Sequence, residues 1–570
     1  MKKITFLLGL IPFVLNAQNF EEVETVMKGF YYSAGDLADF DGDGFTDVVM
    51  NGAIDNNGDG NVYLTHNEIY KNNNGTLEFY ADLGSNSTHL GDIKFIDYNN
   101  DGLADIISTG LSYNDIVNYQ QYRFKNTGTG FELDGNLAGK IFGSMEVFDF
   151  NHDGKVDYAL NGTQYVEGVG FTYDLDFYQN TGNGFEAQTA WLPGTQNGSF
   201  KIIDLNNDAH LDAIITGFNS DMEAVFHIYM NNDGVFELTQ ELPAVNSGKI
   251  NFADFNADGF LDMVAVGQDS DYEVYLAYYI NDGNGNFEVN QIENEGLEGG
   301  NVEVGDLNND GYYDFIINGD DDNYDGQVKV FLYKPAEENF ELALDTGIYN
   351  LGSQGTLKLF DYDNDSQLDI LISGFDWADP DMPSLTKLFR NLSTDANLKP
   401  TAPTELSLQQ EDNRLIFSWS GASDDKTPTE SLRYEITVGS NSGEGDIAKY
   451  VVTTPFWFLD FDEVPANLYW SVKSIDASKL YSDASEEGEL SSSEVNFAEE
   501  VQIYPNPAKD FVYIKTSKKI DSVEIYNVNG QRLNLELNHD QINVKQLPSG
   551  VYVLKIQIGN SWVSKKLMVR

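Results

Sequence analysis

Short apolar runs separated by polar, glycine-rich segments recur in a fixed order along the first two thirds of the chain. In one unit, the alternating run IKFID leads into the acidic segment DYNNDGLAD, and the apolar run DIISTG follows. A third run, YRFKNTG, comes next, and a fourth that opens with phenylalanine and glutamate ends the unit. Runs of this length bounded by Gly, Asn and Asp are typical of β-strands joined by hairpin loops. The pattern predicts four antiparallel strands per unit, with the acidic segment as the loop between the first two.

The acidic segment marks the repeat. It occurs seven times, and successive starts are 50 to 58 residues apart. The copies are DFDGDGFTD (39–47), DYNNDGLAD (97–105), DFNHDGKVD (149–157), DLNNDAHLD (204–212), DFNADGFLD (254–262), DLNNDGYYD (306–314) and DYDNDSQLD (361–369). A period of about fifty residues, with four strands and no long helical pattern, is typical of the blades of a β-propeller.

The fourth strands indicate how the array ends. They open at Phe20, Leu77, Phe131, Phe185, Phe236, Phe287 and Phe340, so that each precedes an acidic loop and none follows the last one. An open array would leave the strand at Phe20 without a sheet and the last unit one strand short. If the strand at Phe20 joins the last unit, no free sheet edge remains. We therefore expect an all-β chain whose residues 18–396 form a seven-bladed β-propeller closed by its own N-terminal strand.

Composition limits the classes of partner. The 570 residues include 92 Asp and Glu against 33 Lys and Arg, a formal charge of −59 at pH 7. Phosphates would be repelled, so we expect no nucleic-acid partner and no anionic membrane partner. Hydrophobic residues make up 41% of the chain, which is enough to form a core, and cysteine is absent. Another kind of crosslink must therefore replace disulfides.

The N-terminus predicts export. MKKITFLLGLIPFVLNA has two lysines, a short apolar run and a small residue at Ala17, which is the layout of a secretory signal peptide (residues 1–17). A buried N-terminal strand is the alternative interpretation. No later apolar run is long enough to span a membrane, so we expect no transmembrane helix in the mature chain, and we expect that chain to be a monomer.

The loops carry oxygen ligands at alternate positions. Their first, third, fifth and ninth residues are Asp or Asn, the sixth is usually Gly, and the seventh offers a backbone carbonyl. This spacing matches the first nine residues of an EF-hand site, and hard oxygen ligands suit calcium. The predicted ligands are Asp39, Asp41, Asp43, Phe45, Asp47, Asp97, Asn99, Asp101, Leu103, Asp105, Asp149, Asn151, Asp153, Lys155, Asp157, Asp204, Asn206, Asp208, His210, Asp212, Asp254, Asn256, Asp258, Phe260, Asp262, Asp306, Asn308, Asp310, Tyr312, Asp314, Asp361, Asp363, Asp365, Gln367 and Asp369. We expect several calcium ions, up to seven.

A single such loop would fit an ordinary turn, since Asp, Asn and Gly are common turn residues, but seven copies in one register favour a metal. Ala209 and Ser366 replace the glycine and would be strained by a positive φ, so occupancy of the loops 204–212 and 361–369 stays open. The segment DNNGDGN at 55–61 has Tyr63 where the closing acid belongs, and we interpret it as a plain turn.

With these loops the repeats resemble the FG-GAP or VCBS family of calcium-binding propeller repeats, found in integrin α-chains and many exported bacterial proteins. The resemblance covers about residues 19–396. It implies that the metal loops lie on one face of the ring and that ligands bind on the opposite face.

Two smaller domains follow. The segment 397–494, with LIFSWSGASDD, LRYEITVG and LYWSVKSIDAS, predicts a β-sandwich and resembles a fibronectin type III module. The segment 497–570, with YPNPAKDFVYIK, VEIYNVNGQ and INVKQLPSGVYVLKI, resembles the type A C-terminal sorting domain of the Bacteroidetes type IX secretion system. That resemblance implies a partner in the type IX machinery and a secreted or surface-attached product; it leaves open whether the domain is removed and whether the product is released.

For function, two hypotheses remain. A binding protein would use aromatic residues in the loops after each second strand, beside acids and amides that suit glycan or surface-protein ligands; the candidates are Tyr113, Tyr165, Tyr173, Phe218, Tyr272, Tyr324 and Trp377. A polysaccharide lyase or glycoside hydrolase would need a base or an acid pair, but no catalytic residue stands out. His66, His89 and His227 have no evident partner in the sequence and are interpreted as surface or packing residues. We expect a non-catalytic binding or adhesion protein, with the enzyme as the alternative.

Overall fold

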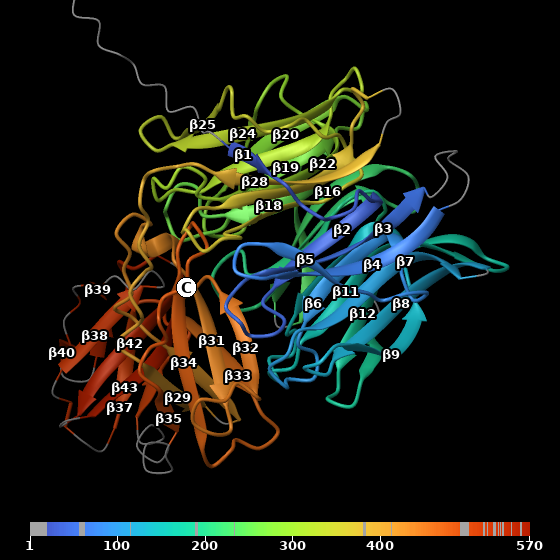
Figure 1. Cartoon of the computed structure of the whole chain (residues 1–570). Coiled ribbons are helices and arrows are strands. Elements are labelled where there is room, and N and C mark those ends of the chain that lie inside the picture. Colours follow the sequence, from blue (N-terminus) through green and yellow to red (C-terminus); the bar gives the residue numbers. More distant parts are fainter. Residues whose placement is uncertain are drawn as a thin grey trace, which may run out of the picture.

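The computed structural model describes residues 20–55, 63–114, 116–188, 192–232, 234–379, 383–411 and 413–490, and residues 501–570 except 517–518, 521, 528–531, 534, 536, 539–540, 549 and 559–560. The predicted signal peptide and almost all of the predicted turn at 55–61 lie outside the described residues. Within them the chain is all-β, as predicted, and the only helix is a 3₁₀ turn, η1 (Thr429–Ser431). Figure 1 shows many small sheets set side by side.

Seven antiparallel sheets of four strands follow one another between residues 20 and 391. Sheets 1 to 3 contain β2 (Tyr31–Ala38), β3 (Asp47–Asp55), β4 (Tyr63–Asn72) and β5 (Leu77–Asp82); β6 (His89–Ile96), β7 (Asp105–Asn114), β8 (Ile116–Asn126) and β9 (Phe131–Ala138); and β10 (Ile141–Phe148), β11 (Asp157–Val166), β12 (Gly170–Asn180) and β13 (Phe185–Gln188).

Sheets 4 to 6 contain β14 (Phe200–Ile203), β15 (Asp212–Phe218), β16 (Ala224–Asn232) and β17 (Val235–Glu241); β18 (Asn246–Ala253), β19 (Asp262–Gln268), β20 (Val274–Asn281) and β21 (Phe287–Gln291); and β22 (Glu298–Gly305), β23 (Asp314–Asp320), β24 (Gly326–Lys334) and β25 (Asn339–Leu342). Sheet 7 contains β26 (Leu357–Phe360), β27 (Asp369–Phe375), β28 (Ser384–Asn391) and β1 (Phe20–Val23).

The seventh sheet takes its fourth strand from the N-terminus. β1 pairs antiparallel with β28, with Phe20 opposite Asn391 and Val23 opposite Leu388. Phe20 is buried with Leu332 and Phe389 in the core between sheets 6 and 7. The first strand of the chain therefore completes its last sheet, as the order of the Phe-Glu strands predicted.

Burial within a sheet falls from the second strand to the fourth. β15, β19 and β23 are buried at every position, because neighbouring sheets cover both of their faces. The fourth strands β17 and β21 instead expose most of their residues. This explains why the second strands read as continuous apolar runs.

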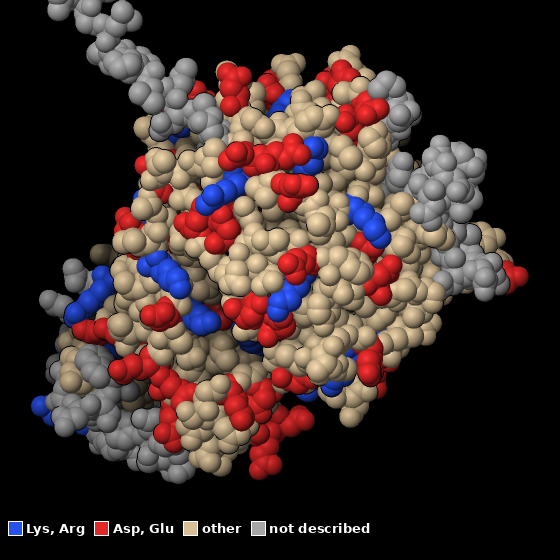
Figure 2. Space-filling model, viewed as in Figure 1, with Lys and Arg blue, Asp and Glu red and all other residues tan. Residues whose placement is uncertain are grey.

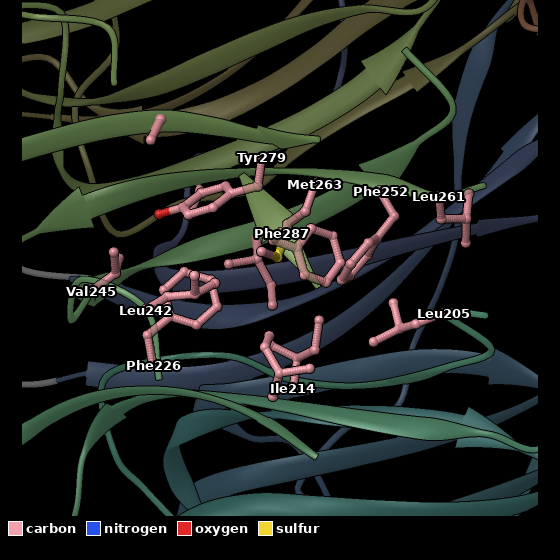
Figure 3. Close-up of a cluster of buried hydrophobic side chains, with 14 of the residues drawn as sticks. Leu205, Ile214, Phe226, Leu242, Val245, Phe252, Leu261, Met263, Tyr279 and Phe287 are labelled. Carbon is pink, nitrogen blue, oxygen red and sulfur yellow. The ribbon is translucent and has the colours of Figure 1, made fainter. Parts of the chain in front are cut away.

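The core lies between the sheets. Between sheets 4 and 5, Ile214 and Phe226 face Met263 and Tyr279, all buried (Figure 3). Phe226 and Tyr279 meet edge to face with ring centroids 5.4 Å apart, an arrangement that aromatic pairs prefer.

The first strands of the sheets contact one another in order: β2 with β6, β6 with β10, β10 with β14, β18 with β22, β22 with β26, and β26 with β2. Residues from the first strand of every one of the seven sheets line a single cavity of about 160 Å³. The seven sheets thus meet at one central place, and sheet 7 lies beside sheet 1.

Sequence reasoning missed a repeated glycine six residues before the acidic loop. A Cβ at Gly143 would lie 1.8 Å from the carbonyl oxygen of Asn161, and one at Gly248 would lie 1.8 Å from that of Val266. Glycine is required because the second strand passes too close for any side chain.

Two modules follow the seven sheets. The middle module has the sheets β29 (Ser407–Glu411), β30 (Arg414–Ser418) and β33 (Phe456–Asp460), and β32 (Ala448–Val452), β31 (Arg433–Gly439), β34 (Leu468–Ile475) and β35 (Gly488–Leu490). Both sheets share one core, which holds Trp419, Tyr434 and Trp470 as predicted.

The C-terminal module also has two sheets around one core. They are β36 (Gln502–Tyr504), β37 (Phe511–Lys515), β41 (Gln541–Asn543) and β40 (Leu537–Asn538), and β39 (Arg532–Leu533), β38 (Ser522–Asn527), β42 (Gly550–Ile558) and β43 (Ser561–Val569).

Candidate functional site

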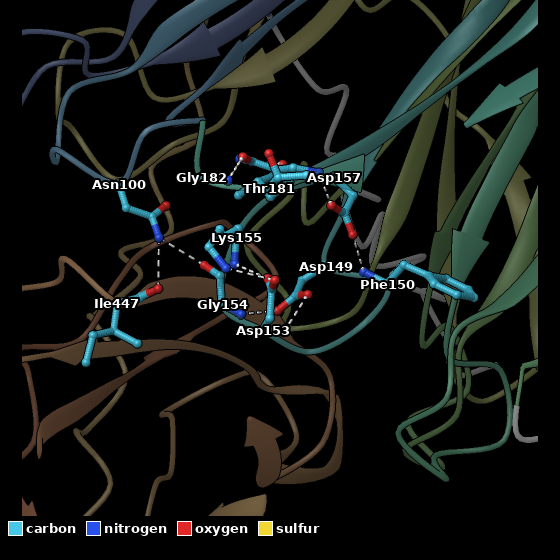
Figure 4. Close-up of polar contacts among 12 residues, drawn as sticks. Asn100, Asp149, Phe150, Asp153, Gly154, Lys155, Asp157, Thr181, Gly182 and Ile447 are labelled. Atoms are coloured by element: carbon cyan, nitrogen blue, oxygen red, sulfur yellow. Dashed lines mark hydrogen bonds and ion pairs between the residues drawn. The ribbon is translucent and has the colours of Figure 1, made fainter. Parts of the chain in front are cut away.

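All seven acidic segments are loops between the first and second strands of a sheet, as predicted. They therefore lie at corresponding ends of their sheets. In loop 3 (149–157), the Asp149 carboxylate accepts the N–H groups of Asp153 (3.1 Å) and Gly154 (2.8 Å), and Asp153 accepts the N–H of Lys155 (2.9 Å) (Figure 4). The first residue accepts from the fifth and sixth, and the fifth accepts from the seventh, in every loop. All seven loops therefore share one pattern of backbone-to-carboxylate hydrogen bonds.

The sixth residue has a positive φ in every loop, including 68° at Ala209 and 70° at Ser366. The predicted sharp turn is therefore present in the two loops that lack glycine. The fourth residue also has a positive φ in all seven, and it is Gly42, Asn100, His152, Asn207, Ala257, Asn309 or Asn364. Sequence reasoning missed this second left-handed position, although Asn there is a signal for it.

The first, third and fifth residues converge. Carboxylate oxygens of Asp39, Asp41 and Asp43 lie within 4.8 Å of one another, and so do those of Asp361, Asp363 and Asp365. The side-chain oxygens Asn151 Oδ1 and Asp363 Oδ1 are buried, and no hydrogen-bond partner is found for them. Convergent carboxylates and unpartnered buried acceptors at the third position suit a hard cation, so the donor set fits calcium.

The ninth residues, which were also predicted as ligands, are fully buried and make a second kind of contact. Asp262 Oδ1 accepts the N–H of Asn281 (2.9 Å), and Oδ2 accepts the N–H of Phe255 (3.0 Å). Asp47 makes the same two bonds with Asn72 and Phe40. Both oxygens thus hold the hairpin together, and a metal contact of the ninth residues stays a prediction, as does that of the seventh-residue carbonyls.

Asparagines at the end of the third strand add further hydrogen bonds to the ninth-residue aspartates' contacts; we call this set of hydrogen bonds the clamp. Asn281 Nδ2 donates to Leu261 O (3.0 Å) in its own loop and to Leu205 O (2.8 Å) in the loop of the preceding sheet. Equivalent residues are Asn72, Asn126, Asn180, Asn231 and Asn391. Sequence reasoning passed over them, although an asparagine recurs there in KNNN, KNTG and QNTG.

Crowded acids perturb each other in these loops. Burial, together with neighbouring carboxylates, raises the pKa of Asp105 to about 7 and those of Asp212 and Asp262 to about 8. Burial likewise raises the pKa of Asp306 to about 7. A divalent cation beside these carboxylates would favour their charged forms.

Basic side chains accompany some loops. Lys71 Nζ lies 3.0 Å from Asp43 Oδ2, Lys125 Nζ lies 3.3 Å from Asp101 Oδ2, and Arg390 contacts Asp363 (2.9 Å) and Asp365 (2.8 Å). These three bases occupy one equivalent position on β4, β8 and β28. Elsewhere acidic side chains are spread over the surface with basic ones set among them, as the face in Figure 2 shows.

The middle module lies against the acidic loops. Asn100 Nδ2 donates to Ile447 O (2.8 Å; Figure 4), and Asp460 N–H donates to His152 O (2.7 Å). Lys479 Nζ donates to Leu359 O (3.0 Å) at the end of β26. This loop face is therefore largely an internal contact surface.

The predicted ligand-face residues lie at the other end of the sheets. Tyr165, Tyr272 and Tyr324 are 53%, 64% and 69% exposed. Phe218 is buried, with its ring centroid 6.2 Å from that of Tyr272. Trp377 Nε1 donates to Asp320 Oδ1 (2.8 Å), and the side chain of Tyr113 lies outside the described residues.

Tyr173 lines a cavity of about 250 Å³ between sheets 3 and 4 at this end. Asp174, Thr195, Asn219 and His227 also line it. Sequence reasoning missed the cavity because its wall comes from β12, β16 and the connection between the two sheets.

The histidines have partners that the sequence did not reveal. His66 Nδ1 lies 2.7 Å from Asp82 Oδ2, His89 Nδ1 lies 2.9 Å from Leu111 O, and His227 Nδ1 lies 3.4 Å from the Tyr229 hydroxyl. Lys28 also bonds to Glu68 (2.5 Å) beside His66. The Lys28 ammonium already neutralises Glu68. We therefore interpret the cluster of His66, Glu68 and Asp82 as a contact that holds the N-terminal segment, rather than as a metal site.

Two family models match parts of the chain. Residues 502–570 match the secretion system C-terminal sorting domain. The FG-GAP-like repeat matches residues 39–108, 204–265 and 254–317. The first match implies export by type IX secretion to the cell surface or beyond, and FG-GAP-like repeats suggest a binding or surface role.

No curated protein matches the chain. Among solved structures, the FN1–FN3 domains of chicken CNTN1 match at 10% identity with a TM-score of 0.15, covering 47% of this chain and 98% of that one. A structure from a study of the GH130 family of mannoside phosphorylases, which contains glycoside hydrolases that target β-1,2 mannosidic linkages in Candida mannan, matches at 9% identity with a TM-score of 0.22, covering 65% and 87%. Scores this low support no argument.

No helix in the described part of the chain has the length and apolar character needed to cross a membrane.

Proposed function

We propose that the chain is an exported, calcium-stabilised seven-bladed propeller that binds a glycan or a surface protein without turnover. The observation that carries the calcium part is the common geometry of the seven loops. Each has acidic or amide side chains at the first, third and fifth positions of one turn. In two loops three carboxylates converge within 4.8 Å, and two loops keep buried acceptors for which no partner is found. With no cysteine in the chain, calcium would supply the missing crosslinks.

The closed ring is supported by contacts at three places. β26 of the last sheet touches β2 of the first, β1 completes the last sheet, and all seven first strands line one cavity. A closed ring leaves no sheet edge for pairing with another chain.

The ligand would bind at the end of the sheets away from the acidic loops. That end has exposed tyrosines at 165, 272 and 324 and a cavity lined by hydroxyl, amide, carboxylate and imidazole groups. Aromatic faces beside such polar groups suit sugar rings and their hydroxyls. The middle module covers much of the opposite end.

Calcium is tested on the chain without residues 1–17. Isothermal titration should give several sites, and chelation should lower the melting temperature strongly. A site at ten times its dissociation constant adds about 1.4 kcal/mol, so several sites together would have a large effect. No heat of binding together with an unchanged melting temperature would refute the calcium proposal.

Binding is tested with a panel of polysaccharides and surface proteins, scored both for retention and for new reducing or unsaturated ends. We expect retention without new ends. The double variant Tyr272→Ala, Tyr324→Ala should lose retention while keeping the wild-type melting temperature, since both side chains are exposed. New ends produced by the purified protein would show that it is an enzyme.

A further inference from the structure

The seven acidic loops differ in what lies over them. The loops of sheets 3 to 6 (149–157, 204–212, 254–262 and 306–314), here called the covered loops, touch the two trailing modules. The loops of sheets 1 and 7 (39–47 and 361–369) are called the open loops. Asp149, Asp254 and Asp306, the first residues of three covered loops, are only 3%, 6% and 1% exposed, whereas Asp39 is exposed.

The modules contact the predicted calcium ligands themselves. Ser431 Oγ donates to Asp254 Oδ2 (2.8 Å). The N–H of Asp306 donates to Ala477 O (2.9 Å). Lys566 of the C-terminal module lies 3.4 Å from Asp208 O. Ion and module would therefore share residues.

Other contacts hold the turns of the covered loops rather than their ligands. Ser478 Oγ donates to Asn309 Oδ1 (2.9 Å), and Lys426 Nζ donates to Asn309 O (2.6 Å). The Phe458 ring centroid lies 4.1 Å from that of His152. Asn309 and His152 are the left-handed fourth residues of their loops. The module therefore contacts the turn of each of these two loops. The first aspartate of the loop holds that turn in its conformation by accepting backbone N–H groups.

The two groups of loops also differ in the cation that the end of the third strand supplies. The base that reaches the open loops is Lys71 or Arg390, and Lys125 does the same in sheet 2. At the equivalent positions in sheets 4, 5 and 6 the chain has Met230, Ile280 and Leu332. These strands thus supply no cation there, and the cations beside the covered loops come from elsewhere: Lys155 Nζ of loop 149–157 lies 2.8 Å from Asp153 Oδ2, and Lys566 belongs to the C-terminal module.

Bringing three aspartates per loop under another module is unfavourable, because the carboxylates lose water while they still repel one another. A bound divalent cation removes that cost and fixes the loop. Resting on the proposed function that the loops bind calcium, we propose that calcium in the covered loops holds the middle module on the loop face, and that the docked module in turn tightens those sites. Two ligands that favour one state must favour each other equally, so the effect is reciprocal.

The test compares matched variants of the full chain without residues 1–17. Asp310→Asn changes the fifth residue of a covered loop, and Asp43→Asn changes the fifth residue of an open loop; both side chains are exposed, and each accepts the N–H of the seventh residue of its own loop. Each should remove or weaken one calcium site in isothermal titration. Hydrogen exchange of the amides of Asp306 and Asp460, which donate across the interface, reports docking.

We expect Asp310→Asn to speed exchange at Asp306 and Asp460 at least about fivefold at limiting calcium, and Asp43→Asn to leave it unchanged. Ser431→Ala, from the module side, should weaken a calcium site by a similar factor. Exchange of the amides of Ala265 and Val266, in the middle of β19 and buried in the cores between sheets, controls for general unfolding.

Three results would overturn the proposal. If calcium binds but chelation leaves the interface amides protected, docking is independent of the ion and the calcium function stands alone. If Asp43→Asn and Asp310→Asn speed exchange equally, the covered loops are not special. If no calcium binds to the wild-type chain, the proposed function fails and this inference fails with it.

Discussion

Asn281 shows how one side chain joins two sheets. Its amide donates to a carbonyl in the loop of sheet 5 and to another in the loop of sheet 4, and its own N–H holds Asp262. All of these groups are buried, so water cannot replace the hydrogen bonds that are lost with the side chain.

Asn281→Ala should therefore lower the free energy of unfolding by about 1–3 kcal/mol, since it leaves two buried carbonyls without donors. Asn284→Ala, on the exposed tip of the same hairpin, is the matched control and should stay within about 0.5 kcal/mol of wild type. Denaturant unfolding at saturating calcium measures both. Equal effects would mean that the clamp contributes nothing beyond the hairpin.

His89 gives a pH dependence. Burial lowers its pKa, while its Nδ1 lies 2.9 Å from Leu111 O. The folded state thus favours the neutral ring, so its contribution is complete above the unfolded pKa of about 6.5 and is lost as pH falls toward the lower folded pKa.

For His89→Gln, which does not titrate there, the difference in melting temperature from wild type should shrink between about pH 7.5 and pH 5.5. Calcium is kept saturating, and carboxylate titration is common to both proteins. A difference that stays constant across this range would contradict the assignment.

At this scale the sequence predicts the chemistry of the first, third and fifth loop residues, because their spacing is local. It does not separate them from Asp47 or Asp262, whose partners come from the third strand. The sequence also does not predict which aromatic side chains are exposed. Phe218 and Tyr272 occupy similar positions in the repeat, yet Phe218 is buried and Tyr272 is mostly exposed.

Among the elements, β1 determines whether sheet 7 has its fourth strand and a covered edge. Its pairing with β28 covers an edge that would otherwise be free, and Phe20 fills the core between sheets 6 and 7. The contact joins residues far apart in the sequence, so it forms only after the intervening sheets have been placed.

Phe20→Ala should lower the free energy of unfolding by about 3–5 kcal/mol, as for other buried phenylalanines, and should promote aggregation through the loosened edge. Glu22→Ala on the same strand removes a half-exposed ion pair with Lys387 and should cost about 0–1 kcal/mol. Denaturant unfolding and light scattering measure the two effects. Similar values for both variants would show that β1 does not hold sheet 7.

The strand order was predictable because each sheet is made of consecutive hairpins, except for β1, and counting the Phe-Glu strands revealed that exception. Docking of the middle module was not predictable. It depends on single residues such as Ser431 and Ala477 that contact loops far away in the sequence.

At the scale of the whole molecule, one position of the first strand carries alternating charges around the centre. Three residues before each acidic loop the chain has, in order, Asp36, Lys94, Glu146, Lys201, Asn251, Glu303 and Lys358. The signs alternate except at Asn251. An odd number of sheets cannot alternate fully, and the neutral residue lets Lys358 of sheet 7 lie next in order to Asp36 of sheet 1.

Ion pairs join neighbouring sheets at this level. Lys201 Nζ lies 2.7 Å from Glu146 Oε1, and Lys358 Nζ lies 3.0 Å from Glu303 Oε1. Nearby lysines lower the pKa of Asp92 and of Glu303 despite their burial. Because Glu146 and Glu303 each pair with a lysine of the next sheet, these contacts favour one order of sheets.

Exchanging one pair tests this order. Lys201→Glu places two acids side by side and should lower the melting temperature, as should Glu146→Lys, whereas the double variant restores the pair in reverse. The coupling energy in this cycle should be favourable by about 0.5–3 kcal/mol. Recovery will be incomplete, because Glu146 has Lys94 as its second neighbour in the series and the exchange puts a like charge beside it, whereas the second neighbour of Lys201 is the neutral Asn251. If the double variant is as unstable as the sum of the single variants, the alternation does not hold the sheets in order.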